Sequence, residues 1–184
     1  MAISGESITN PLTGEEITFV ATSSETGGKE LRMRMAVKPA GFAPTEHIHM
    51  SQEERFTIVR GEILLMIKGE ERTLGEGESV AVPPGTPHVW SNQSNQEAEI
   101  DIQFRPPGNM EEFFENLFGL AQDGRTNQRG EPNLLQCSLL SPEYGLYMAN
   151  PPVPVQRALF AAVRPFARML GYRASYPQYQ KPTN

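Results

Sequence analysis

The chain has 184 residues, 38% of them hydrophobic, with a formal net charge of −6 at pH 7 and a single cysteine, Cys137. This length suits one well-buried domain, the lone cysteine excludes an internal disulfide or a cysteine-cluster metal site, and the acidic balance argues against nucleic acid as a partner. No apolar run approaches the roughly eighteen residues of a membrane span and the N-terminal segment has no export signal, so we predict a cytoplasmic protein without a membrane span.

Strand patterns fill the first two thirds of the sequence. A hairpin is predicted from residues 17–22 and 31–38, joined by a turn near Gly27 and Gly28, because apolar residues alternate along its second arm. Further strands, separated by glycine, proline or asparagine turns, are predicted at 54–60, 62–68, 79–83, 88–92 and 97–104. Many short strands with such turns are typical of a closed antiparallel sheet.

Two segments among these strands contain every histidine of the chain. The first, 41–61, places His47 and His49 two residues apart, and residues two apart in a strand share one face. In the second, 77–92, a Pro-Pro-Gly turn precedes His88 and begins a new strand. Three imidazoles can therefore converge on one point.

The face pattern also chooses between two adjacent acids in the first segment. Glu54 shares its face with Phe56 and Ile58, which belong in the core, whereas Glu53 shares its face with Arg55. A carboxylate that points into an apolar barrel is costly unless it is paired, and a divalent cation is the expected partner. The alternative is a set of hydrogen-bonded core histidines without metal. The predicted ligands of one metal ion are His47, His49, Glu54 and His88.

These two segments resemble, position by position, the paired motifs of the cupin superfamily. The first motif is matched by Gly41, His47, His49, Glu54 and Gly61, and the second by Gly77, Pro83, Gly85, His88 and Asn92. The resemblance covers roughly residues 15–105. It implies a small single-domain (monocupin) metal-binding protein whose strands form an antiparallel jelly-roll β-barrel.

After residues 106–108, which break the strand pattern, apolar residues recur at helical spacing. An amphipathic helix is predicted over 110–124, a second helix from Pro132, and a third over about 155–170. Pro165 lies inside the third helix and should kink or break it, because proline has no backbone N–H.

The predicted fold class is therefore mostly β, with a jelly-roll (cupin) barrel and a C-terminal α-helical extension. We assign residues 1–108 to the barrel domain and residues 109–184 to an extension that packs on the barrel or at the interface of an expected homodimer. The third helix could instead lie on a membrane, because one face is apolar and Arg157, Arg164 and Arg168 are close by. Pro165 and the modest charge make that the weaker alternative.

The same face pattern predicts an apolar substrate site. The candidate substrate-binding residues are Met33, Met35, Phe56, Ile58, Trp90 and Phe104. No inward arginine or lysine is evident, and all five tyrosines lie in the tail, which argues against sugar-nucleotide epimerisation and against recognition of small dicarboxylates. A small apolar or aromatic molecule, held to the metal by one or two oxygens, fits better.

Three imidazoles and one carboxylate suit a divalent transition metal ion, namely iron, manganese, nickel, copper, cobalt or zinc, rather than calcium or magnesium. Four protein ligands leave coordination positions open, which favours catalysis or ligand capture over a purely structural site. The cupin resemblance implies a dioxygenase-like oxidoreductase, with Glu54 as a catalytic base. The alternatives are a non-redox metal-dependent isomerase, cyclase or lyase, and a non-catalytic small-molecule-binding protein.

Overall fold

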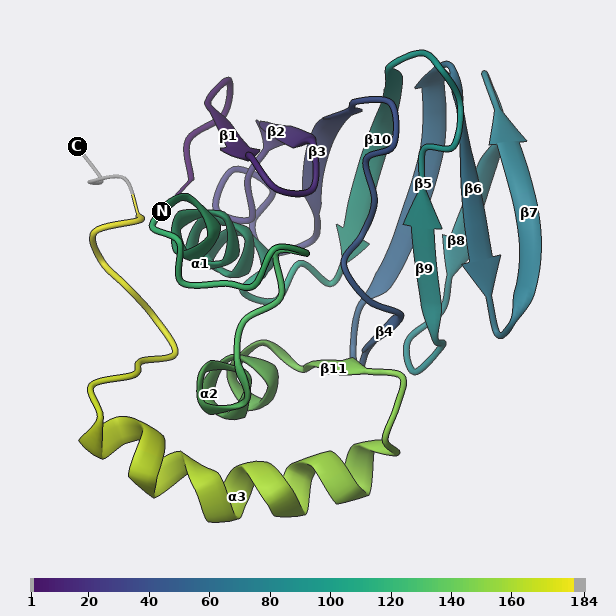
Figure 1. The fold of residues 1–184 in the computed structure, drawn as a ribbon. Helices are drawn as coiled ribbons and strands as arrows, with labels where there is room; N and C mark the ends of the chain where they lie inside the picture. The colour runs from purple at the N-terminus through teal and green to yellow at the C-terminus, as the bar shows by residue number, and fades with distance from the viewer. Residues whose placement is uncertain (1, 181–184) are drawn as a thin grey trace.

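Two antiparallel sheets face each other in the computed structural model of this protein, which describes residues 2–180 (Figure 1). The strands of the first sheet, in spatial order, are β1 (Ser7–Asn10), β2 (Glu15–Ala21), β3 (Leu31–Val37), β10 (Ala98–Arg105), β5 (Glu53–Arg60) and β8 (Ser79–Val82). Those of the second are β11 (Leu146–Met148), β4 (His47–His49), β9 (His88–Ser91), β6 (Glu62–Ile67) and β7 (Glu70–Gly75). This arrangement confirms the predicted mostly β fold with a jelly-roll barrel.

Alternating burial along the central strands explains why this sequence folds as a barrel. In β3, every second side chain from Leu31 to Val37 is buried, and β5 and β10 show the same alternation. On the outer face, Arg34 donates a hydrogen bond to Asp101 at 2.6 Å. The apolar set of each strand therefore faces the core while charged residues meet solvent.

Four strands were not among those predicted: β4, which is only three residues long, and β1, β7 and β11. β7 exposes nearly all of its side chains, and β1 is mostly polar, so neither shows a clear alternation of apolar residues. β11 is three residues long and lies in the tail, where only helices were expected. It nevertheless pairs with β4 and extends the second sheet.

The predicted C-terminal helices are present as α1 (Met110–Gln122), α2 (Leu134–Tyr144) and α3 (Val153–Met169). α1 packs its aromatic side chains inward: Phe113 and Phe118 are buried, and the Phe114 ring lies 6.1 Å from that of Phe104 on the barrel. α2 begins at Asn133, whose side chain accepts a hydrogen bond from a backbone N–H of the first turn. Among the described residues, no helix is both long enough and apolar enough to cross a membrane.

The break predicted at Pro165 does not occur, because α3 is one continuous helix through that residue. Pro165 is exposed, so water can satisfy the carbonyl group that loses its helical partner. The helix ends where expected: Gly171 has a φ of +83°, and the N–H of Tyr172 donates to the carbonyl of Ala167.

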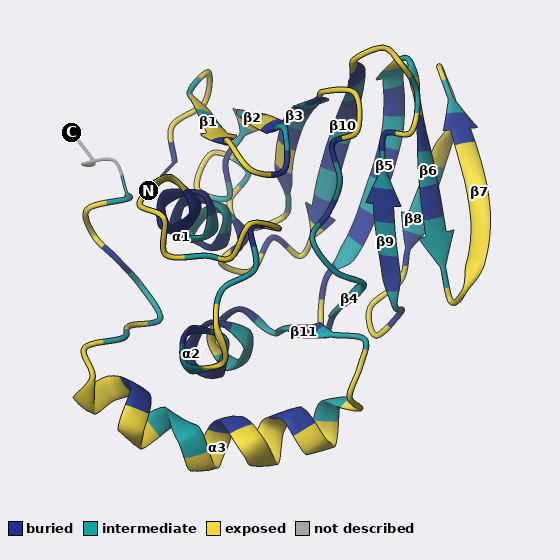
Figure 2. Ribbon diagram, in the orientation of Figure 1, coloured by how far each residue is buried: buried dark blue, intermediate teal, exposed yellow. Residues whose placement is uncertain are grey.

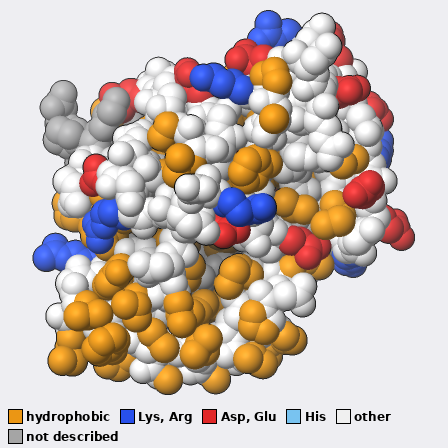
Figure 3. Space-filling model, viewed as in Figure 1, with side chains coloured by type: hydrophobic (Ala, Val, Ile, Leu, Met, Phe, Trp, Pro, Cys, Tyr) orange, Lys and Arg blue, Asp and Glu red, His pale blue; other side chains and the backbone are white. Residues whose placement is uncertain are grey.

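The face that α3 turns toward the protein is not its apolar stripe. Its buried residues are Gln156, Phe160 and Ala167. The large apolar side chains that are exposed instead are Val155, Leu159, Phe166, Met169 and Leu170. The outer side of the α3 ribbon is coloured as exposed in Figure 2, and hydrophobic side chains gather over this part of the molecule in Figure 3. The aromatic stripe of α1 is therefore packed inward, whereas the apolar stripe of α3 is exposed.

Candidate functional site

The sheet itself brings the two histidine segments together. His47 on β4 is the direct cross-strand partner of His88 on β9. The turn before β9 is also tied to β4, because the N–H of Gly85, which has a φ of +75°, donates to the carbonyl of His49 at 2.8 Å. β4 is held on its other side by β11, where Leu146 pairs with His49.

Glu54 completes this cluster from the facing sheet. Its carboxyl oxygen Oε2 lies 2.8 Å from His88 Nε2 and 3.1 Å from His49 Nε2. Glu54 is buried, whereas the side chain of Glu53 is 37% exposed, so β5 has the predicted register. The ligand-type atoms of all four predicted residues lie within 4.8 Å of one another.

The surroundings of the imidazoles fit a metal ion. Nδ1 of His47 lies 2.9 Å from the carbonyl of Thr45, and Nδ1 of His88 lies 3.0 Å from that of Thr86. A carbonyl oxygen only accepts, so each Nδ1 carries the proton, and such a bond fixes a ring with Nε2 toward the cluster. These residues therefore fit one divalent transition metal ion, with three nitrogens and one carboxylate oxygen.

Burial and mutual contact set the charges of the cluster. Burial, together with repulsion from His88 and His49, lowers the pKa of His47 to about 3, so its imidazole is neutral. Burial alone would raise the pKa of Glu54, but His49 and His88 outweigh it and hold that pKa well below its usual value. Burial also opposes charge on His88, yet its hydrogen bond to Glu54 raises the pKa of His88. The cluster thus holds an ionised carboxylate among imidazoles.

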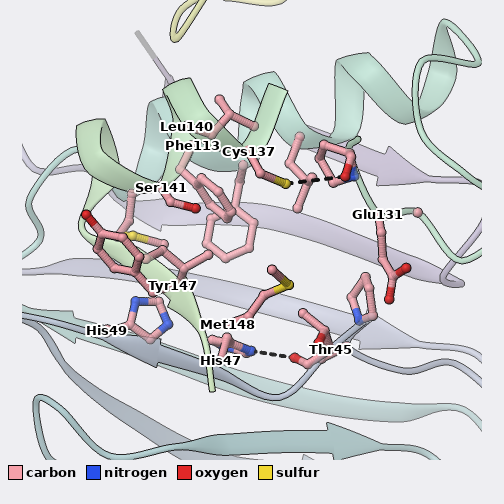
Figure 4. A pocket seen from close by; sticks show the side chains of 18 of the residues that line it. Thr45, His47, His49, Phe113, Glu131, Cys137, Leu140, Ser141, Tyr147 and Met148 are labelled. Atoms are coloured by element: carbon pink, nitrogen blue, oxygen red, sulfur yellow. Dashed lines mark hydrogen bonds between the residues drawn. The ribbon is translucent and has the colours of Figure 1, made fainter. Parts of the chain in front are cut away.

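A cavity of about 340 Å³ opens from the cluster between the barrel and the C-terminal extension (Figure 4). Its lining includes His47, His49 and Glu54. More than half of the lining residues come from α1, α2, β11 and the loop before α2. Within residues 2–180, no lysine or arginine lines this cavity. The extension therefore supplies much of the wall of the candidate site.

The structure divides the predicted substrate-binding residues into two groups. Met35 and Trp90 line the cavity. The residues that do not line it, and are buried in the core instead, are Met33, Phe56, Ile58 and Phe104. Two of these pack behind the cluster: the ring centroid of Phe104 lies 5.1 Å from that of His49, and Phe56 lies 6.1 Å from His88. Inward-facing residues of a small barrel fill its interior, and only those near the extension reach the open space.

Comparison with known proteins places this architecture in a family. Residues 33–102 match the family described as Cupin domain. The structure of KdgF from Halomonas sp. has a similar fold, with a TM-score of 0.51 over 58% of this chain and 91% of that one, at 17% identity. Residues 33–102 of this chain are therefore a cupin domain.

Two curated relatives of this cupin are named as oxidoreductases. The probable oxidoreductase yanE of Aspergillus niger is 31% identical over 156 residues, which cover 76% of this chain and 60% of that protein. Oxidoreductase macE of Penicillium terrestre is 32% identical over 125 residues, which cover 60% of this chain and 47% of that protein. The cupin described here therefore matches only about half to three fifths of the length of these relatives.

Sequence reasoning missed several residues that line the cavity of this cupin. Tyr147 was expected to lie outside the barrel with the other tyrosines, but β11 pairs with β4 and brings it to the cavity wall. Cys137 also lines the cavity, and burial raises the pKa of its thiol to about 11, so it is not a thiolate. Glu15 lines the cavity too. The sequence pattern could have predicted its inward position, because it shares the inward face of β2 with Ile17 and Phe19.

The stability of this cupin should depend on pH through Glu15. Burial raises its pKa to about 7, with only the Thr13 hydroxyl acting in the opposite direction, against 4.5 for an unperturbed glutamate. The stability that the protonated Glu15 side chain contributes to the folded state is therefore fully present below pH 4.5, and it is lost as the pH rises through 7. The free energy of unfolding should fall by about 3 kcal/mol across that interval from this group alone.

Urea unfolding of the Glu15→Gln variant tests this expectation. The stability of the variant relative to the wild type should increase as the pH rises from about 5 to about 8, because glutamine does not ionise. Glu16→Gln is the matched control, since Glu16 is exposed on the same strand. An equal pH dependence in the wild type and in Glu15→Gln would contradict the expectation.

Proposed function

We propose that this cupin is a metal-dependent oxidoreductase with dioxygenase-like chemistry, acting on a small apolar or aromatic molecule that bears oxygen. The observation that carries the proposal is the cluster of three imidazoles and one carboxylate at the wall of a largely apolar cavity. The names of the two oxidoreductase relatives support the same class of reaction. A homodimer and a cytoplasmic location remain predictions from the sequence.

In this proposal, the metal ligands are His47, His49, Glu54 and His88. A divalent transition metal held there would supply Lewis acidity toward a substrate oxygen and, if redox-active, electron transfer to dioxygen. The hydrogen bonds of His47 and His88 to backbone carbonyls hold these two rings in place. Phe104 and Phe56 pack on the imidazoles and limit their movement.

Glu54 is the proposed general base. Its pKa is held low by the adjacent histidines, so the carboxylate is ionised and can accept a proton from a substrate hydroxyl group. The apolar side chains of the cavity wall exclude water and favour a substrate with an apolar body.

Dioxygen uptake with defined metals tests the proposal. Protein loaded in turn with iron, manganese, nickel, copper or cobalt is mixed with catechols, flavonoids and enediols, and oxygen consumption is followed with an electrode. We expect uptake with at least one redox-active metal and none with Glu54→Ala. In a parallel thermal-shift screen, these apolar probes should raise Tm, whereas dicarboxylates and sugar phosphates should not.

The same experiment separates the alternatives. Conversion of a probe without oxygen uptake, observed also with zinc, would indicate a non-redox isomerase, cyclase or lyase. Stabilisation by a probe without any conversion would indicate a binding protein. Stabilisation by the anionic compounds alone would contradict the apolar substrate class.

A further inference from the structure

The cavity has a second buried carboxyl group, far along its wall from the metal cluster. Four residues of the first sheet line the cavity, one on each of four neighbouring strands: Glu54 on β5, Ile102 on β10, Met35 on β3 and Glu15 on β2. Along this series, each residue lies two positions away from the residue that pairs directly with the preceding member of the series. These side chains therefore form a diagonal row across the inner face of the sheet.

This row is acidic at both ends and apolar in the middle. Diagonal neighbours in a sheet lie about 7 Å apart, so three steps cover roughly 20 Å of wall between Glu54 and Glu15. Ile102 and Met35 separate the two acids. A ligand that reaches from one end to the other is elongated and has an apolar central part.

Glu15 lacks a cationic partner among the described residues. The hydrogen bond recorded for its side chain is the one donated by the hydroxyl of Thr13. Other acids near the cavity are better satisfied, since Glu131 accepts a hydrogen bond from Asn127 at 2.7 Å and lies 3.5 Å from Arg129. A buried carboxyl group without a cation is costly for folding, and such groups are concentrated at functional sites.

Asn10 supplies an unused hydrogen-bond donor beside Glu15. The two residues are direct cross-strand partners between β1 and β2. Asn10 Oδ1 accepts from the N–H of Leu12 at 3.1 Å, which fixes the orientation of the amide, and its Nδ2 is buried without a partner in the described structure. That nitrogen would lie 3.6 Å from a Cβ placed on Gly130, a residue of the cavity lining.

We propose that Glu15 and Asn10 form a second binding site in the cavity, which receives a hydroxyl group of the ligand. A hydroxyl matches both vacancies, because it donates to the carboxylate of Glu15 and accepts from Nδ2 of Asn10. The ligand class is then an elongated molecule with oxygen functions at both ends and an apolar centre. The assignment of its other end to the metal rests on the proposed function.

Paired probes test the second site in the full-length, zinc-loaded protein. The probes are 4-alkylcatechols of increasing chain length, each made with a terminal hydroxyl and with a terminal methyl group. Calorimetric titration should show that at one length the hydroxyl form binds roughly tenfold more tightly, as expected for one additional hydrogen bond in a buried site. Glu15→Leu should abolish this preference, whereas the matched control Glu16→Leu, on the exposed face of the same strand, should retain it.

The outcomes separate the second site from the metal site. Equal binding of both forms at every length, or a preference that persists in Glu15→Leu, would overturn the second site and leave the metal-bound end intact. If no catechol binds at all, the proposed metal-bound headgroup is wrong. Linear diols and the corresponding alcohols, which have no catechol ring, then probe Glu15 alone, and the absence of a Glu15-dependent preference would overturn this inference as well.

Discussion

Replacing His49 by alanine should reduce bound metal from one ion per chain to a small fraction of that value. His49 is buried, and its Nε2 lies 3.1 Å from Glu54 Oε2 inside the cluster, so the substitution removes one of the three nitrogen ligands. Loss of a partner that only orients a ligand typically costs about 10–100-fold in metal affinity, and loss of a ligand should cost more. Elemental analysis of protein expressed without an affinity tag measures the stoichiometry.

The adjacent acids on β5 provide a matched pair for the same measurement. Glu54→Ala should also lose metal, because it removes the only carboxylate of the cluster within the described residues. Glu53→Ala should retain it, since that side chain points outward and contacts Arg55. Full stoichiometry in His49→Ala, or metal loss in Glu53→Ala with retention in Glu54→Ala, would show that the ligand assignment is wrong.

Truncation of the chain after Arg105 should give insoluble or largely unfolded protein. The deletion removes α1 and α2, which bury Phe113, Phe118, Leu120 and Leu140 against the rest of the protein. Each such side chain contributes about 1.5–3 kcal/mol on burial, so a few of them equal the whole stability of a typical domain, about 5–15 kcal/mol. The deletion also removes β11 and leaves β4 as an edge strand that is paired only with β9.

Solubility after expression and the unfolding temperature measure this effect. The control is removal of residues 181–184 alone, which lie outside the described structure. That variant should retain the wild-type Tm. A soluble truncation after Arg105 with an unchanged Tm would show that the barrel does not depend on the extension.

Most of the barrel could be predicted because its strands are buried on one face. Alternation along β3, β5 and β10 fixed both the strands and the side that faces the core. Prediction failed where this signal was missing, as in exposed β7 and in the three residues of β11. In α3 the helical periodicity was present in the sequence, but the side that faces the protein could not be predicted from it. The helix buries Phe160 and Ala167 rather than its larger apolar stripe.

The metal cluster was predictable for a similar reason, whereas the cavity was not. The two-residue spacing of the histidines and the alternation of inward and outward positions along a strand are local properties. They were sufficient to predict that His47, His49 and Glu54 point to one site. The cavity wall depends on which segments of the tail meet the barrel mouth, and this is a tertiary property without a local pattern. Tyr147 therefore escaped prediction, while Glu15 could have been found by the parity that identified Glu54.

β11 and β4 share one hydrogen-bonded ladder. Ligand binding at the cluster and ordering of β11 therefore strengthen each other. Leu146 pairs with His49 and Met148 pairs with His47, so any ligand that holds these histidines also stabilises the strand behind them. By thermodynamic linkage, ordering of β11 strengthens binding of that ligand by the same factor by which the ligand favours the ordered strand, so a substitution that loosens β11 should weaken ligand binding. Amide hydrogen exchange at residues 146–148 therefore reports occupancy of a metal site to which these residues contribute no ligand.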